Sequence, residues 1–256
     1  MSPPSEPATF DHESLDGARF VDTGLRGARF VRSSLAGAVM RGVDASGVDI
    51  DDPWLIESGE PLLVNGVDVT SFVDAELDRR FPGRADRRAG DPASLRTAWT
   101  AVEQTWQSTV ARVSSMPPDT ADISVDGEWS FAETIRHLVM ATDMWLGRAI
   151  LELDNPYHPI GKPNAEYESD GHDASVFASG TPPYPDVLDV RAERMTMVRD
   201  FIAGATPDLL AETRRNPWAP EHAETVLSCL HTILEEEWEH HRYAVRDLDA
   251  IAQRSA

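Results

Sequence analysis

Cysteine and lysine are nearly absent from this sequence of 256 residues, and each scarcity excludes something. Cys229 is the single cysteine, so no disulfide can form within the chain, and a cytoplasmic location is expected. Lys162 is the single lysine, so arginine supplies nearly all of the positive charge. The formal net charge is −21, which repels nucleic acids and anionic membranes, and we expect neither as a partner.

Long apolar runs are also missing. No stretch approaches the roughly 20 consecutive apolar residues that a membrane helix needs. The N-terminal letters MSPPSEPATFDHES contain neither the basic region nor the apolar run of a signal peptide. We therefore expect a protein with one large or two small domains, preceded by a disordered tail over residues 1–9.

The first part of the chain repeats. Large apolar residues recur every five positions: Phe10, Leu15, Phe20, Leu25, Phe30, Leu35 and Met40. A period of five fits neither a helix nor a plain strand, but it fits a solenoid that turns one apolar residue inward on each side. This segment resembles the pentapeptide-repeat family, which implies a right-handed β-helix. The resemblance covers residues 10–50 and implies about two coils, which bury little core by themselves.

A connector over residues 51–90 follows the repeat. Asn65-Gly66 lies between short apolar runs and predicts a two-residue hairpin turn. The letters SFVDAELDRRF, just before Pro82, predict a short helix.

Residues 91–256 have the apolar spacing of helices. One stripe recurs at 3.6-residue intervals: Leu95, Trp99, Val102, Trp106 and Val113. Ser130 with Glu133 three residues later forms a capping box before a second helix. A long connection, about 154–185, leads to a third helix, and a fourth spans about 221–251. The sequence thus predicts a mainly α-helical protein, with a four-helix bundle that contains one long crossing loop.

The fourth helix carries four glutamates and two histidines within residues 235–241. On a helical wheel, Glu237 and His241 lie inside the apolar stripe, while Glu236 and His240 lie outside it. A buried carboxylate and imidazole are costly unless they are paired or bind a metal. The spacing of four residues is that of a helical pair of metal ligands, and His137 on the second helix is the candidate third ligand. A hydrogen-bonded pair of Glu237 and His241 without a metal remains the alternative.

Two segments, DGEWSFAETIRHLVMATDMWL and EEEWEHHRYAVRDLDAI, resemble the DinB-like superfamily of metal-binding four-helix bundles. That group includes mycothiol-dependent maleylpyruvate isomerase and thiol S-transferases. The resemblance implies that His137, Glu237 and His241 hold a divalent metal, with Zn²⁺ expected first and Fe, Ni or Mn as alternatives. It also implies mycothiol as a cosubstrate and a small-molecule substrate.

Three further residues are candidates for substrate binding. His158 lies on the long loop that covers the bundle's open end, and such loops often carry function. Arg194 lies near the inward side of the third helix, where it could bind a carboxylate, and Arg242 follows the ligand pair of the fourth helix.

Two other functions remain open at this stage. Metal-activated water would make the protein a hydrolase rather than a thiol-dependent transferase or isomerase. A non-catalytic role, in which the repeats mimic DNA and bind a topoisomerase, is disfavoured by their charge. Residues 10–50 contain six acids and five arginines, a net charge of only −1. The repeats are instead expected to be a structural or dimerising appendage, which makes a homodimer an expectation.

Overall fold

The computed structural model describes residues 8–254, and the chain divides into two compact units, one up to Ile50 and one over Asp51–Ala256. The expected tail over residues 1–9 lies largely outside the described residues. In the part of the chain that the structure describes, no helix is both long and apolar enough to cross a membrane.

The unit up to Ile50 is a regular coil with a turn every ten residues. Gly17, Gly27, Gly37 and Gly47 sit in these turns at φ between 73° and 75°, a conformation that glycine adopts without strain. Backbone bonds such as Ala18 N to Leu15 O, at 2.9 Å, close each turn. None of residues 8–50 is in a strand, because these bonds close single turns and do not form a ladder between neighbouring chains. The expected β-helix is therefore not shown.

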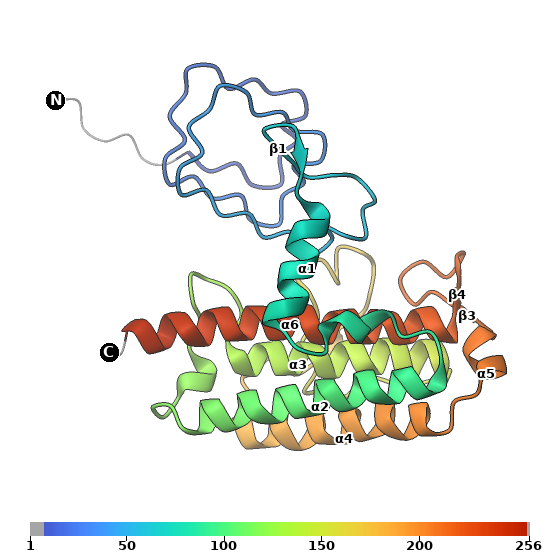
Figure 1. The fold of residues 1–256 in the computed structure, drawn as a ribbon. Coiled ribbons are helices and arrows are strands. Elements are labelled where there is room, and N and C mark those ends of the chain that lie inside the picture. Colours follow the sequence, from blue (N-terminus) through green and yellow to red (C-terminus); the bar gives the residue numbers. More distant parts are fainter. Residues whose placement is uncertain (1–7, 255–256) are drawn as a thin grey trace. The chain divides into compact units, whose positions relative to one another are not determined.

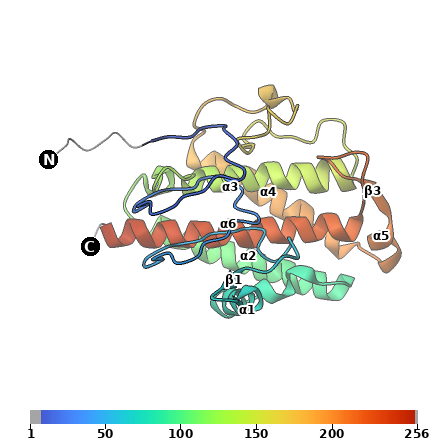
Figure 2. The same cartoon turned by 90° about the horizontal axis from the view of Figure 1, so that it is seen from above.

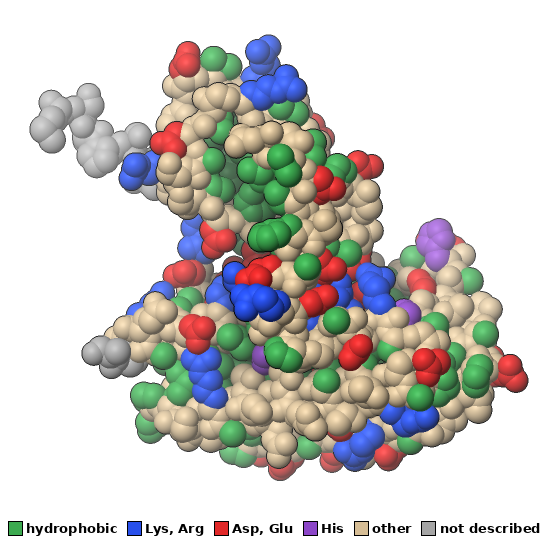
Figure 3. Space-filling view, in the orientation of Figure 1, with side chains coloured by type: hydrophobic (Ala, Val, Ile, Leu, Met, Phe, Trp, Pro, Cys, Tyr) green, Lys and Arg blue, Asp and Glu red, His purple; other side chains and the backbone are tan. Residues whose placement is uncertain are grey.

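The apolar residues of this coil are not buried, which corrects the expectation that they turn into a core. The members of the five-residue period, from Leu15 to Met40, are between 43% and 64% exposed. Figure 3 shows green apolar side chains gathered on this unit. Two coils have too little interior to remove such side chains from water.

The second unit begins with the connector. A two-stranded hairpin forms from β1 (Leu63–Val64) and β2 (Val67–Asp68), and Asn65 and Gly66 make the turn as predicted. The predicted short helix is α1 (Thr70–Arg80), followed by the 3₁₀ helix η1 (Arg84–Arg88).

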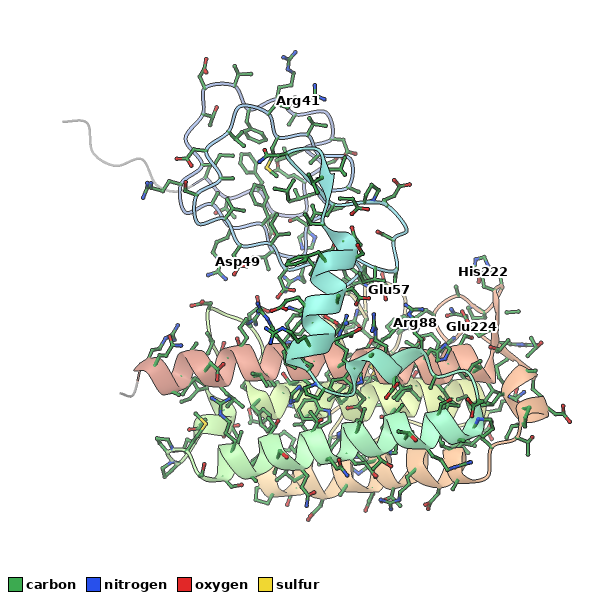
Figure 4. All side chains as sticks on the ribbon, viewed as in Figure 1. Arg41, Asp49, Glu57, Arg88, His222 and Glu224 are labelled. Carbon is green, nitrogen blue, oxygen red and sulfur yellow. The ribbon has the colours of Figure 1, made fainter. Side chains whose placement is uncertain are left out.

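Ion pairs and one close backbone approach hold the connector in place. Nη1 of the buried Arg84 lies 2.7 Å from Asp74 and 2.6 Å from Asp78. Arg88 reaches Glu57 at 2.7 Å, and these two side chains are labelled in Figure 4. Gly83 has a φ of 99°, and an added Cβ would meet Ala101 Cβ at 2.7 Å, so only glycine fits there.

Four long helices form the bundle, and Figures 1 and 2 show them running side by side. They are α2 (Pro92–Ser114), α3 (Phe131–Thr142) continued by the π-helix η3 (Asp143–Ile150), α4 (Tyr184–Ala203) and α6 (Val226–Arg254). The short elements between them are η2 (Thr120–Asp122), η4 (Ala174–Val176), α5 (Pro207–Ala211), and the hairpin strands β3 (Thr213–Arg215) and β4 (Ala223–Thr225).

Helix positions follow local sequence signals. The side chain of Asp91 accepts bonds from Ala93 N at 2.8 Å and Ser94 N at 3.1 Å, which starts α2. Ser130 and Glu133 form the predicted capping box that starts α3. The predicted stripe of α2 is buried, with Leu95 and Trp99 among its members, and it belongs to the same core as apolar residues of α4 and α6. The hairpin of β3 and β4 was not predicted, and it delays the start of α6 to Val226.

Candidate metal centre

Three side chains from two helices converge at the edge of the bundle: His137 from α3, and Glu236 and His240 from α6. Nε2 of His137 lies 3.4 Å from Oε2 of Glu236, and Nε2 of His240 lies 3.1 Å from the same oxygen. One donor atom from each residue lies within 4.8 Å of the other two. Among the described residues, no other group of three histidine, cysteine or acidic side chains is close enough to hold a metal ion.

These separations fit a metal site. Donor atoms about 2.0–2.1 Å from a tetrahedral Zn²⁺ lie about 3.3 Å from one another. The two distances to Glu236 are close to that value. Two imidazoles and one carboxylate are also a donor set that divalent transition metals accept.

A backbone contact fixes which nitrogen of His137 faces the cluster. Nδ1 of His137 lies 3.0 Å from the carbonyl oxygen of Lys162. A carbonyl oxygen only accepts hydrogen bonds, so Nδ1 carries the proton, and the lone pair of neutral His137 is on Nε2. That lone pair faces a carboxylate oxygen of Glu236. Two acceptors this close need a cation or a proton between them, and a divalent metal would supply that cation.

The charge states of the α6 pair suit metal binding, which needs an ionised carboxylate and neutral imidazoles. Burial would raise the pKa of Glu236, but protons on the Nε2 atoms of His137 and His240, which face this carboxylate when no metal is bound, outweigh burial and hold the pKa far below its usual range. Burial lowers the pKa of His240, and nearby Glu236 opposes this only in part. At neutral pH the cluster therefore presents a negative carboxylate and a neutral His240.

Aromatic rings border the cluster. The ring of Trp129 lies 4.8 Å from that of His137 and is stacked 6.0 Å from that of His240. Tyr243, one turn further along α6, has its ring 5.8 Å from His240. The side chain of Glu236 is 31% exposed, so the cluster is accessible from solvent. Such an arrangement is typical of a reactive site rather than a closed structural one.

The structure does not bring Glu237 and His241 to His137, which corrects the predicted ligand set on α6. Both are buried as predicted, at 1% and 6% exposed. Glu237 forms an ion pair with Arg191 of α4, and His241 Nε2 lies 2.9 Å from Thr109 Oγ1 of α2. Each buried side chain therefore pairs with a different helix, and the two do not form the metal-free pair considered as the alternative.

The cluster contains the α6 residues one position before the predicted pair, and this difference has a geometric cause. Successive residues on a helix point about 100° apart, so adjacent residues of α6 face different neighbours. Glu237 and His241 face α4 and α2, whereas Glu236 and His240 face His137 on α3. The wheel identifies the most buried face of α6, and the cluster lies beside that face.

The predicted substrate-binding residues all have partners within the protein. Asp143 accepts bonds from Nε of Arg194 at 2.6 Å and from the backbone nitrogen of His158 at 2.8 Å. Arg242 lies 2.6 Å from Asp51, and its guanidinium is 4.5 Å from the ring centre of Tyr243. Of the three, Arg242 lies nearest to the aromatic border of the cluster, while His158 and Arg194 position the long loop.

Sequence reasoning missed Glu236, His240, Trp129 and Lys162. Glu236 and His240 are four residues apart, as are Glu237 and His241 one position later, so the spacing alone does not distinguish the two pairs. Trp129 stands within the segment that carries the family resemblance, but no sequence signal marks Lys162.

The fold and this cluster define a helical bundle with a candidate metal centre on two of its helices. The comparisons agree with that class: the model of the DinB superfamily matches residues 101–244. The chain belongs to the DinB superfamily. No curated protein and no solved structure matches it.

Proposed function

We propose that the protein is a divalent-metal-dependent enzyme that uses a low-molecular-weight thiol, with mycothiol the expected one, as a transferase or isomerase. The proposal of metal binding rests on the cluster of His137, Glu236 and His240. In this cluster the Nε2 lone pair of His137 faces a carboxylate oxygen of Glu236. The thiol part is supported by the resemblance of the helix segments around these residues to the mycothiol-dependent members of the superfamily.

Each residue of the cluster has a definite role in this proposal. His137, Glu236 and His240 would hold the cation, Zn²⁺ first among the candidates, and Lys162 O orients His137. Bound there, a divalent cation would supply Lewis acidity, lowering the pKa of a ligated thiol. The rings of Trp129 and Tyr243 would shield an organic ligand from water on one side.

The reacting thiol must come from outside the chain. Cys229 is fully buried, and burial raises the pKa of its thiol to about 12. It lies on α6 two turns before the cluster, among core residues. A buried, protonated thiol neither binds metal nor attacks an electrophile. A small thiol that enters from solvent fits the partly exposed cluster.

Cobalt spectroscopy tests this function. Protein loaded with Co²⁺ in place of Zn²⁺ is titrated with mycothiol, and a new sulfur-to-metal charge-transfer band in the near ultraviolet is expected. His240→Ala should lose the band together with the metal. Glu237→Gln is the matched control on the same helix, and it should retain both.

The contrary result is equally specific. If saturating thiol leaves the cobalt spectrum unchanged while a simple ester or amide is hydrolysed, the thiol proposal is wrong and activated water takes its place. If neither change occurs, the site is a non-catalytic metal site.

A further inference from the structure

A hollow of about 360 Å³ lies between α3 and the long loop that joins η3 to α4. The three cluster residues do not line it, but Lys162, which contacts His137, does. Its wall includes Glu133 and Arg136 of α3, and Lys162, Phe177 and Gly180 of the loop. This volume is within the range of small-molecule sites in proteins. The hollow therefore has room for the part of a substrate that does not react.

Lys162 connects the hollow to the cluster. Its backbone nitrogen donates to Arg136 O at 3.1 Å, and its carbonyl accepts from His137 Nδ1 at 3.0 Å. Its ammonium lies 5.8 Å from the ring centre of Trp129, the same ring that contacts His137 and His240. The backbone of this single lysine is thus fixed against α3, while its side chain borders the site.

The charges in the wall of the hollow do not balance. Lys162 Nζ lies 3.1 Å from Oε1 of Glu133, and Arg136 contributes a second positive charge. Arg136 is bound by backbone carbonyls, at 2.8 Å from Ile160 O and 3.3 Å from Ala178 O, which do not neutralise it. One carboxylate therefore faces two cations.

The charge balance of the hollow depends on Glu133 being ionised. Burial would raise its pKa, but the Ser130 backbone N–H, Lys162 and Arg136 outweigh it and hold the pKa below its usual range. The wall carries one uncompensated positive charge at neutral pH, and the ammonium of Lys162 has three donors, only one of which is needed for Glu133. A ligand with a negative group would complete the balance.

We propose that Lys162 binds an anionic group of the substrate, a carboxylate or a phosphate, in this hollow. This inference rests on the proposed function, because it adds a substrate class to the same site. The reacting end of the substrate would face His137, Glu236 and His240, and its charged end would face Lys162. Phe177 and Pro163 line the hollow for the apolar part between these ends.

The first experiment measures protection of Lys162 from acetylation by acetic anhydride, with no thiol present. Because the chain contains one lysine, one peptide reports the modification by mass spectrometry. Titrations followed by the acetylation rate should give a Kd about tenfold lower for hexanoate or hexyl phosphate than for hexanamide, the effect of one charge-assisted hydrogen bond. The stronger of the two anions identifies the preferred group. Equal Kd values for both anions and for hexanamide would overturn the inference.

The second experiment joins the two sites in one ligand. Cobalt-loaded protein is titrated with 6-mercaptohexanoate and with 6-mercaptohexanol, and the charge-transfer band reports binding. The acid should bind about tenfold more tightly than the alcohol in wild type and in Lys162→Arg, and equally in Lys162→Gln. Equal affinities in all three proteins would contradict the role of Lys162.

Two further results separate the causes of failure. If neither thiol perturbs cobalt, the thiol part of the proposed function fails, and the protection experiment still decides the inference. Glu133→Gln keeps a side chain that can cap α3 but removes the competing charge. It should increase the affinity for hexanoate, and a decrease would contradict the charge balance described above. Metal content and helical circular dichroism verify that each variant is folded.

Discussion

Glu237 and Arg191 form an ion pair in the core of the bundle, with side chains 1% and 5% exposed. The buried guanidinium also lies 5.9 Å from the ring centre of Trp106, and its Nε and Nη1 have no hydrogen-bond partner among the residues that the structure describes. Arg191 therefore depends on Glu237 for its charge partner. Removal of one member of a buried pair leaves the other charge uncompensated.

We expect Glu237→Ala to lower the free energy of unfolding by about 3–5 kcal/mol, the cost of leaving a buried charge unpaired. Urea denaturation measures this change. Glu237→Gln keeps the shape and an acceptor for Arg191, and it should cost less. Metal content should remain at the wild-type level in both variants, because Glu237 lies outside the cluster. Loss of the metal in folded Glu237→Gln would instead restore Glu237 as a ligand.

At the residue scale, the sequence predicted burial better than it predicted partners. The wheel correctly placed Glu237 and His241 on the buried face of α6, and burial lowers the pKa of His241 to about 4, so it is neutral. It could not show that this face meets Arg191 and Thr109, because those residues lie far away in the sequence. Which residues of α6 reach His137 depends on how α3 and α6 are packed, and periodicity does not contain that information.

At the scale of elements, the best predictions rest on local chemistry. The capping box of Ser130 and Glu133 and the turn at Asn65-Gly66 were recognised because their bonds join residues at most three positions apart. The π-helical end of α3, residues 143–150, was missed. Its backbone bonds, such as Leu151 N to Leu146 O, depend on packing that the sequence pattern does not reveal.

One arginine joins several parts of the long loop over residues 151–183 to α3. The guanidinium of Arg136 donates to Ile160 O at 2.8 Å, Ala178 O at 3.3 Å and Gly180 O at 3.4 Å. These bonds join two distant parts of the loop to α3. The loop positions Lys162, whose carbonyl orients His137, so Arg136 supports the metal cluster indirectly.

We expect Arg136→Met to loosen this loop while the bundle stays folded, because methionine keeps part of the packing but donates no hydrogen bonds. Hydrogen exchange measured by mass spectrometry should accelerate at least tenfold over residues 158–180 and remain unchanged in α2. Metal affinity should fall, since outer partners of a ligand typically contribute about 10–100-fold. Arg199→Gln, on an exposed part of α4, is the control. Unchanged exchange in Arg136→Met would show that other contacts hold the loop.

At the scale of the whole molecule, the unit up to Ile50 differs in kind from the rest. Its large apolar side chains are exposed, whereas those of α2, α3 and α6 are buried. Its charge is nearly balanced, although the chain as a whole carries −21. Nearly neutral apolar surface permits self-association that the charge of the other unit would oppose. We therefore propose that this unit mediates formation of a homodimer.

Deletion of residues 1–50 should convert a dimer to a monomer without loss of the metal, because His137, Glu236 and His240 all lie in the second unit. Light scattering after size-exclusion chromatography measures the mass of each species, and elemental analysis measures the metal. Replacement of Phe20 and Phe30 by serine in the full-length chain is the matched variant. If the full-length protein is itself a monomer at high concentration, the proposed dimer is wrong. Loss of the metal from a folded truncated protein would show that the repeat contributes to the site.

The cluster of His137, Glu236 and His240 is the central claim, and adjacent residues of α6 provide its sharpest test. His240→Ala and His241→Ala differ by one position on the same helix and remove the same side chain. We measure metal per chain by elemental analysis of both variants, purified without chelators. About one divalent ion per chain is expected in the wild-type protein and in His241→Ala, and almost none in His240→Ala. Full metal occupancy in folded His240→Ala, with loss of the metal in folded His241→Ala, would contradict the account and return the site to the buried face of α6.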